Sequence, residues 1–368
     1  MNKYFDICAS TPIHKDVANF ITKNSSLIYG NPSSIHEYGQ KSKAVLERAR
    51  LNIANSINCS VDEIIFTSGG SISNNLALIG VLNHGDHFIT SSYEHPAILN
   101  VLKFLKSKNV EVSVLKPNKA WIVSPDKVKS AIKKNTKLIS IMYINNEIGT
   151  INPISEISKI ANENNILLHT DAVQAIGKID LDIKNAGVDL LSLSGHKFYA
   201  PKGVGLLYVK QNTKIDPILF GGGQESGLFP GTENIINIGA MGLAATICHK
   251  EKKEKLNHIK ELDSYFIELL ENSNIDYTIN GENRAPGIIN LTLNKTKAPS
   301  FIINLDKEGY AISAGSACAS GASTGSTTLT EIGLDIDTIR KSYRISFSQF
   351  HTKEDLKGLV GCINKYIK

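Results

Sequence analysis

The sequence predicts an α/β protein with a mainly parallel, seven-stranded sheet and a smaller α+β region toward its C-terminal end. Between residues 60 and 210, short apolar runs alternate with helix-length segments, as in sheets whose strands are joined by crossover helices. The chain has 368 residues, more than one hydrophobic core usually supports. From about residue 245, a lysine-rich helical segment leads into shorter apolar runs.

We therefore expect two packed domains. The large domain comprises residues 15–245, and it contains all the runs assigned to the main sheet. The small domain combines residues 246–368 with residues 1–14, which form a short extended arm containing Pro12.

The strands expected in the large sheet are, in chain order, Glu63–Phe66, His87–Thr90, Val110–Leu115, Leu138–Ile144, Ile166–His169, Leu190–Leu193 and Val204–Val209. The expected helices are 35–57, Ser73–Leu82, Pro96–Lys106, Pro125–Lys133 and Ile154–Asn164. Ser33 or Ser34 is the expected N-cap of the first helix. The last strand follows its predecessor too closely for a crossover helix, so we expect it to pair antiparallel.

The small domain is expected to begin with a long helix and to continue with short strands and helices. The helices are His249–Leu270, 298–307 and Lys353–Tyr366, and the strands lie near Tyr277–Ile279, Gly287–Leu293 and Arg344–Ser348.

The composition is that of an ordinary globular protein, with 42% hydrophobic and 20% charged residues. The net charge of +5 comes from scattered lysines without interleaved aromatic residues, so a nucleic-acid partner is not expected. No apolar run approaches the ~18 residues of a membrane span, and the N-terminal segment MNKYFDICASTP has no signal-peptide core. The five cysteines contain no CxxC pair, which predicts neither a disulfide framework nor a metal site. We therefore expect a cytoplasmic protein.

One segment, Asp189–Lys197, joins a buried strand to a small polar turn that ends in lysine. Burying an ammonium costs on the order of several kcal/mol unless the site uses it. Taken alone, Lys197 is either a surface lysine on a turn or a lysine with a lowered pKa that forms a Schiff base. The residues that follow the other strands decide between these alternatives.

Polar groups follow the ends of the other strands as well. They are Gly70, Ser71, His95, Asn146, Asp171 and Gln174, and Ser194 and His196 stand beside Lys197. The carboxyl ends of parallel strands meet at one edge, where ligands bind in open α/β sheets, so we expect these groups to converge. The Gly/Ser-rich turn at Gly70 opens a helix, and its backbone N–H groups suit a phosphate.

Pyridoxal phosphate catalysis needs such a set. Lys197 would carry the cofactor, Asp171 would pair with its pyridine nitrogen, and His95 would stack on its ring and shuttle protons. Asn146 and Gln174 would donate to its phenolic oxygen, while Ser71, Ser194 and His196 would hold its phosphate. Taken singly, Asp171 could instead be a turn or helix cap, His95 a hydrogen-bonded core histidine, and the others turn-forming side chains.

The motifs, in this order, resemble those of the cysteine desulfurases, which are fold-type I pyridoxal phosphate enzymes of the class V aminotransferase group. The matching segments span nearly the whole chain: FDICASTP, GNPSSIHEYGQ, FTSGGSISNN, EHPAI, NNEIGTINP, HTDAVQAIGKI, SLSGHKFYAPKGVG, GGGQESGLFPGTEN, SAGSACASG and SYRISFS. The resemblance implies the fold-type I architecture, pyridoxal 5'-phosphate as cofactor and Lys197 as its Schiff-base residue.

The resemblance also implies a homodimer that acts on L-cysteine and passes sulfur to an acceptor protein. Thr232, in the PGTEN segment, is implied to reach the phosphate of the neighbouring subunit's cofactor. Arg344 is implied to clamp the substrate carboxylate, with Asn146 beside it, and a planar bidentate donor suits that task. The alternative for Arg344 is a surface ion pair.

Cys318 lies in a run of small residues, AGSACASG, which predicts a mobile loop. A thiol there can attack the substrate sulfur as a thiolate, leaving a persulfide on Cys318 and releasing alanine. We interpret the other four cysteines, Cys8, Cys59, Cys248 and Cys362, as small buried hydrophobic residues.

Several positions differ from the commonest family pattern. Cys8 lies in an opening motif that usually reads DNAATTP, and Ile72 stands where the phosphate turn often carries glutamate. Ser226, Phe229 and Pro230 replace two arginines and a serine of the entrance segment, and Gln349 stands where arginine is frequent.

Three alternatives to a cysteine desulfurase remain at this point. Two share the fold, a selenocysteine lyase and another class V aminotransferase or lyase, and an aminotransferase would not need Cys318. The third is a non-catalytic scaffold of sulfur metabolism, which would not need both Lys197 and Cys318.

Overall fold

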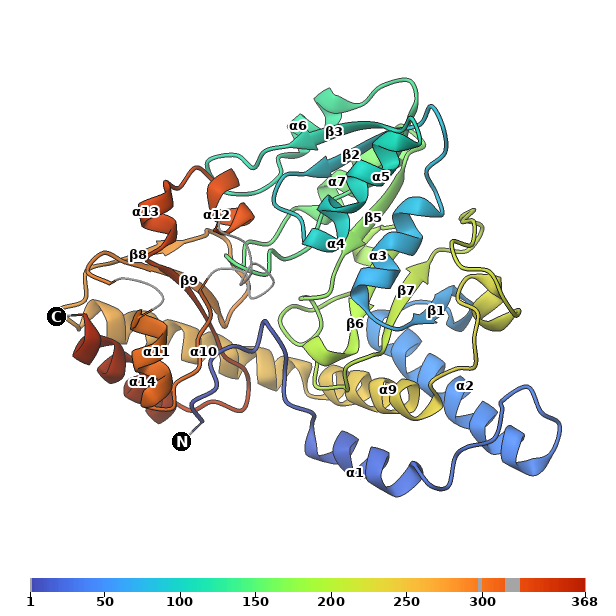
Figure 1. Ribbon diagram of the computed structural model, residues 1–368, viewed down its shortest axis with the longest axis horizontal. Coiled ribbons are helices and arrows are strands. Elements are labelled where there is room, and N and C mark those ends of the chain that lie inside the picture. Colours follow the sequence, from blue (N-terminus) through green and yellow to red (C-terminus); the bar gives the residue numbers. More distant parts are fainter. Residues whose placement is uncertain (1, 297–299, 315–324, 368) are drawn as a thin grey trace.

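The computed structural model describes residues 2–296, 300–314 and 325–367. Its main feature is a seven-stranded sheet with the strand order β1-β7-β6-β5-β4-β2-β3 (Figure 1). The strands are β1 Ile64–Thr67, β2 His87–Ser91, β3 Glu111–Leu115, β4 Thr136–Ser140, β5 Leu167–Asp171, β6 Leu190–Ser194 and β7 Gly205–Val209. β7 pairs antiparallel with β1 and β6, and the other neighbours pair in parallel. The predicted fold class and the antiparallel last strand are confirmed.

The strands at the centre of this sheet are buried on both faces. Every residue of β2 and of β6 is buried, as expected for parallel strands that helices cover on both sides. β3, by contrast, lies at the sheet edge and keeps part of its surface exposed.

The helices of this part are α1 Lys15–Asn24, α2 Glu37–Ile57, α3 Gly70–Ile79, α4 Pro96–Leu99, α5 Val101–Ser107, α6 Pro125–Ala131, α7 Ile154–Glu163, α8 Ile183–Ala186 and α9 Ile235–Lys250. The predicted N-cap of α2 was wrong: the cap is His36, whose side chain accepts a hydrogen bond from the Gly39 N–H. The start of α3 was placed three residues too late, because Gly70 and Ser71 carry little helix propensity.

Three of these helices had not been predicted, α1, α9 and the short α8. The sequence of α9, IINIGAMGLAATICHK, is apolar on nearly every side, so it lacks the alternation of an amphipathic helix. The structure explains the composition, since α9 packs against both α1 and α2 and most of its residues are buried.

The second sheet is smaller and antiparallel, with the order β10-β9-β8. Its strands are β8 Tyr277–Asn280, β9 Ile288–Leu293 and β10 Ser342–Ser346, and its helices are α10 Lys252–Glu271, α11 Ser300–Lys307, α12 Thr327–Glu331, α13 Ile336–Ile339 and α14 Lys353–Tyr366. α9 and α10 run end to end from the large sheet to the small one (Figure 1). None of the helices described is both long and apolar enough to cross a lipid bilayer.

The N-terminal arm, here residues 2–14, joins the two sheets. Tyr4 and Asp6 form parallel bridges with Ala311 and Ser346, so the arm lies beside β10. Farther along, the Thr11 N–H donates to the His196 carbonyl at 2.9 Å, directly after β6.

The buried apolar residues form separate clusters. One cluster contains Phe5 of the arm together with Phe266, Leu291 and Tyr343 around the small sheet. A larger cluster lies between the main sheet and the helices α2, α7 and α9. On this basis we propose the division into a large domain, residues 15–245, and a small domain, residues 1–14 and 246–368.

The contact between α2 and α9 gives a test of this packing. A Cβ on Gly242 of α9 would lie 2.6 Å from the Ala49 Cα of α2. Gly242→Ala should therefore lower the free energy of unfolding by about 1–3 kcal/mol, because the two helices must move apart. Gly361 of α14 has nothing within 4 Å of its Cβ position, so Gly361→Ala, the matched control, should stabilise by up to about 1 kcal/mol. Urea denaturation measures both, and equal shifts would contradict the packing described.

Candidate active site

A cavity of about 280 Å³ lies at the ends of the central strands. Of the residues assigned to the site from sequence, it is lined by Gly70, Ser71, His95, Asn146, Asp171, Gln174, Ser194, His196, Lys197 and Arg344. Thr232 does not line it and is exposed in the segment before α9. Cys318 lies outside the described residues, as does the predicted loop around it apart from Ala314. The structure thus brings together every assigned residue that it describes except Thr232.

Sequence reasoning missed several residues of this cavity: Cys8, Ala9, Asn74, Met142, Ile144 and Val173. Asn74 could have been found, because it lies one helical turn after Gly70 and so faces the same edge. Cys8 is buried, as predicted, but it also lines the cavity. Cys8 and Ala9 contribute backbone carbonyls, which have no signature in the sequence.

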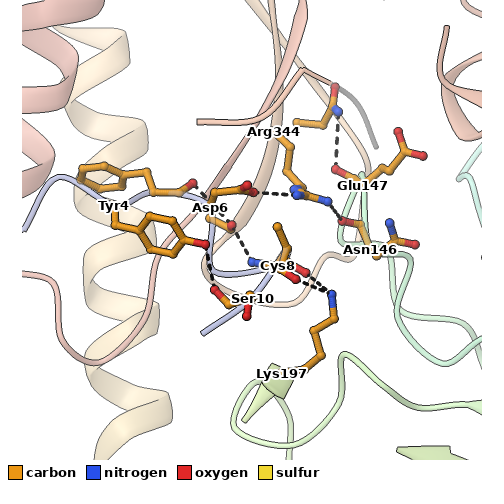
Figure 2. A network of polar contacts seen from close by, with 12 residues as sticks. Tyr4, Asp6, Cys8, Ser10, Asn146, Glu147, Lys197 and Arg344 are labelled. Atoms are coloured by element: carbon orange, nitrogen blue, oxygen red, sulfur yellow. Dashed lines mark hydrogen bonds and ion pairs between the residues drawn. The ribbon is translucent and has the colours of Figure 1, made fainter. Parts of the chain in front are cut away.

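Lys197 lies at the wall of this cavity. It ends a short helical turn, Gly195–Lys197, that follows β6. Its Nζ donates hydrogen bonds to the Cys8 carbonyl at 2.6 Å and to the Ala9 carbonyl at 2.9 Å (Figure 2). The N-terminal arm therefore holds the amine at the cavity wall.

Asp171 ends β5 and is held by two donors. Its Oδ2 accepts from Asn74 Nδ2 at 2.7 Å, and its Oδ1 accepts from the Val173 N–H at 3.0 Å. Both bonds favour a fixed carboxylate, which is the form that pairs with a protonated pyridine nitrogen.

Glu94 is a buried carboxyl near Asp171 that sequence reasoning did not single out. Burial raises the pKa of Glu94 to about 8, and the charge of Asp171 adds to the rise. Its Oε1 accepts from Ser91 Oγ at 2.5 Å and from the Met142 N–H at 2.9 Å. Glu94 is therefore protonated at neutral pH.

The two histidines of the cavity differ in their partners. The Nδ1 atom of His95 accepts from the Ala97 N–H at 3.1 Å, which leaves the proton of a neutral ring on Nε2. The Nδ1 atom of His196 lies 3.2 Å from Ser10 Oγ. Burial lowers the pKa of His196 to about 4, with a contribution from Lys197, so its ring is neutral at pH 7.

The turn before α3 has the shape of a phosphate cradle. Gly69 adopts φ +150°, a conformation that L side chains rarely adopt, and a Cβ on Gly70 would lie 2.8 Å from Val173 Cγ2. The first N–H groups of α3 have no carbonyl partner within the helix and carry its positive dipole end. A second hollow of about 300 Å³ shares Gly70, Ser71, Ser194 and His196 with the cavity and also contacts Lys202.

These features fit pyridoxal phosphate. The cradle offers donors to the phosphate, Asp171 offers a carboxylate to the pyridine nitrogen, and Lys197 offers an amine to the aldehyde. Gln174 donates through Nε2 to the Cys8 carbonyl at 3.0 Å, and the same amide nitrogen carries a second N–H that can serve the phenolic oxygen.

Arg344 of β10 reaches the cavity from the small sheet. It is 2% exposed, and its Nη2 lies 2.7 Å from Asp6 Oδ1 while its Nη1 donates to the Asn146 carbonyl at 2.9 Å (Figure 2). Its ion pair is thus buried rather than at the surface. Within the described residues its Nε–H has no acceptor, and a buried donor left unpaired costs about 1–3 kcal/mol.

Of the positions that differ from the family pattern, neither Phe229 nor Ser226 lines the cavity. Phe229 packs against the apolar cluster around α3 and β2. Ser226, with φ +59°, lies in a separate hollow next to Arg50 and Glu225. Gln349 accepts a hydrogen bond from Tyr199 Oη at 2.6 Å.

Comparison with known proteins agrees with this geometry. The family described as Aminotransferase class-V matches residues 3–359. A protein of Dictyoglomus turgidum named cysteine desulfurase IscS is 42% identical over 371 residues, which cover 99% of this chain and 94% of the relative. This chain belongs to the cysteine desulfurase family.

Other matches are similar in extent. A protein of Methanosarcina thermophila, also named cysteine desulfurase IscS, is 40% identical over 99% of this chain and 92% of its own length. A solved structure described as a NifS-like protein matches with a TM-score of 0.92 at 30% identity and covers 99% of both chains. Another, described as SspA in complex with cysteine, matches with a TM-score of 0.84 at 35% identity over 95% of this chain and all of that one.

Among the residues described, no group of three or more histidine, cysteine, aspartate or glutamate side chains is placed to hold a metal ion. The described cysteines, Cys8, Cys59, Cys248 and Cys362, are all free. Cys59 is half-buried rather than fully buried.

The raised pKa of Glu94 predicts a pH dependence of stability. Between the ordinary value of 4.5 and about 8, the folded protein keeps the Glu94 proton while the unfolded chain loses it. The unfolded state then binds fewer protons, so the stability from this group falls as the pH rises through that window. The side chain in Glu94→Gln is neutral in both the folded and the unfolded state. The free energy of unfolding of this variant, relative to that of wild type, should therefore rise by roughly a few kcal/mol between pH 5 and pH 8.

Denaturation at several pH values measures this difference. Glu156→Gln, on the exposed face of α7, is the control and should follow the wild-type profile. A constant difference between Glu94→Gln and wild type across the window would contradict a protonated Glu94.

Proposed function

We propose that this protein converts L-cysteine to L-alanine with pyridoxal 5'-phosphate as cofactor and transfers the sulfur, as a persulfide on Cys318, to an acceptor protein. The observation that carries the proposal is the convergence of Lys197, Asp171 and the unpaired Nε–H of Arg344 on one cavity. These groups supply an amine, a carboxylate and a carboxylate receptor, which an amino-acid-converting enzyme of this kind needs.

The cofactor would be held by residues of the large domain. Ser71, Ser194, His196 and the first N–H groups of α3 would bind the phosphate, and Asp171 would bind the pyridine nitrogen. Asn146 and Gln174 would donate to the phenolic oxygen, and His95 would lie over the ring. When bound, pyridoxal phosphate supplies an electron sink for the carbon that loses its substituent.

The substrate would be oriented by its carboxylate. Arg344 can donate to that carboxylate through Nε–H, and Asn146 lies beside it (Figure 2). The amino group would then point to Lys197 across the cavity. Once its Nζ is uncharged, Lys197 can accept or return a proton there, and His95 offers a second proton carrier through Nε2.

Sulfur transfer would depend on Cys318. Its thiolate sulfur attacks the substrate sulfur, the substrate Cβ–S bond breaks, and the bonding electrons stay with the carbon fragment, which takes up a proton to become alanine. Ser313 is the nearest described anchor, because its backbone exchanges hydrogen bonds of 2.7 and 3.1 Å with that of Arg344. Cys318 follows five residues later, and five extended residues span up to about 17 Å. We infer from this chain length alone that the thiol can reach the substrate.

We also propose a homodimer in the cytoplasm. Ile35 and Phe220 are 96% and 87% exposed, and Tyr29 and Tyr38 are exposed as well. Tyr29 and Tyr38 lie against each other, with ring centroids 5.4 Å apart, and large exposed apolar side chains favour contact with another protein. Ser33 and Glu233 line one hollow, so the segment that precedes α2 lies next to the one that carries Thr232. Free thiols at every described cysteine suit a reducing compartment.

The role of Cys318 as the nucleophile can be tested by substitution. With L-cysteine and a reductant, wild type should release alanine and sulfide in equal amounts, whereas Cys318→Ala should release almost none, because no thiolate then accepts the sulfur. Cys59→Ala is the matched control and should leave the rate unchanged. Alanine from Cys318→Ala at the wild-type rate would point to another class V activity.

Mixed dimers can test whether the two subunits share each cofactor site. If Thr232 binds the partner's cofactor, Thr232→Ala should weaken cofactor retention in the homodimer, since a hydroxyl donor to the phosphate is lost. Lys197→Ala should abolish the covalent protein–cofactor adduct that borohydride traps. Mixed dimers of the two variants pair one intact lysine with an intact threonine from the other subunit, so half of their sites should bind normally. If cofactor retention stays low at every site of the mixed dimers, the sites are not shared between subunits.

A further inference from the structure

Asp6 holds Arg344 without lining the cavity. Its Oδ1 lies 2.7 Å from Arg344 Nη2 (Figure 2). Arg344 is among the residues that surround the cavity, whereas Asp6 is not. Asp6 therefore contacts the guanidinium from outside the set of residues that line the cavity.

The guanidinium of Arg344 has more N–H donors than Asp6 and Asn146 occupy. Of its five N–H groups, Nη2 supplies one to Asp6 and Nη1 supplies one to the Asn146 carbonyl at 2.9 Å. The Nε–H of Arg344 is buried and has no acceptor among the residues described. A carboxylate commonly accepts two parallel N–H bonds from arginine, so the guanidinium can bind one while it keeps both existing partners.

Asp6 is itself fixed by backbone bonds. It forms a parallel bridge with Ser346, two residues beyond Arg344 on β10. The Cys8 N–H donates to Ser346 Oγ at 2.9 Å, and the Ala9 N–H donates to the Asp6 carbonyl at 3.0 Å. The strand that carries the guanidinium thus also fixes the carboxylate that orients it.

We propose that Asp6 is a positioning residue that sets the selectivity of this site for substrates with an α-carboxylate. It holds the guanidinium in one orientation with Nε–H free, so that a carboxylate binds without the entropy cost of ordering a long side chain. The inference rests on the proposed function, because it assumes that Arg344 receives the carboxylate of an amino acid.

The experiment compares Asp6→Ala and Asp6→Asn with wild type in the cofactor-loaded enzyme. Binding of L-alanine and of ethylamine, which is the same amine without the carboxylate, is followed by the cofactor absorbance. Asp6→Ala should weaken L-alanine binding by about tenfold or more and leave ethylamine binding unchanged. Asp6→Asn should lose less, because the amide oxygen still accepts from Nη2.

Steady-state kinetics with L-cysteine provide a second test of the role of Asp6. The KM should rise about tenfold in Asp6→Ala with kcat within about threefold of wild type, because the lost orientation affects binding of the carboxylate. Tyr4→Phe is the matched control: it removes a hydrogen bond from Tyr4 Oη to the Ser10 carbonyl within the same arm and leaves the Arg344 hydrogen bonds to Asp6 and Asn146 in place. Its L-alanine and ethylamine affinities should equal those of wild type.

Four outcomes overturn the inference. Tighter L-alanine binding in Asp6→Asn would show that Asp6 competes with the substrate. Equal losses for L-alanine and ethylamine, or a similar loss in Tyr4→Phe, would show that the arm supports the fold alone. Unchanged affinities in both Asp6 variants would show no role. If Asp6→Ala does not fold, the test uses Asp6→Asn alone. The quantity compared with wild type is then the ratio of its L-alanine affinity to its ethylamine affinity.

Failure of the proposed function gives a different pattern. A wild-type enzyme that releases no alanine from L-cysteine, yet prefers L-alanine to ethylamine in an Asp6-dependent manner, would keep the role of Asp6 and reject desulfuration.

Discussion

The pairing of the N-terminal arm with β10 is the interaction on which the site depends. The cavity takes Lys197 from the large sheet and Arg344 from the small sheet, and the arm contacts both. Its carbonyls at Cys8 and Ala9 accept from Lys197, and its carboxylate at Asp6 pairs with Arg344. One short extended segment therefore links the amine at the large sheet to the guanidinium of the small sheet.

Charge in this cavity is arranged by burial as much as by pairing. Burial keeps Glu94 protonated and His196 neutral at pH 7. The charged groups that remain are each held by donors or acceptors, as Asp171 is by Asn74 and the Val173 N–H. A cofactor and a substrate that both carry negative groups therefore meet fixed donors and few competing charges, which is the condition for strong electrostatic stabilisation.

Much of this arrangement could be predicted from sequence, because it follows from the ends of strands. The apolar runs predicted β5 and β6, and Asp171 at the end of β5 and Lys197 after β6 lie at one edge, as expected. What could not be predicted involves contacts without a side-chain signal: the carbonyls of the arm, the uniformly apolar α9, and the burial that changes Glu94. The roles of Thr232 and Cys318 came only from family resemblance and remain predictions.

The long separation of Asp6 and Arg344 has a consequence for how the protein is made. The two residues are 338 positions apart in the chain, and such a contact closes late in folding because a long loop must be ordered first. The ribosome releases the arm long before β10 exists. A nascent chain can thus complete the turn at Lys197 and the phosphate cradle well before it can hold a substrate carboxylate. A chain truncated before β10 would therefore lack both the arginine that receives the amino acid and the strand that holds the arm beside Lys197.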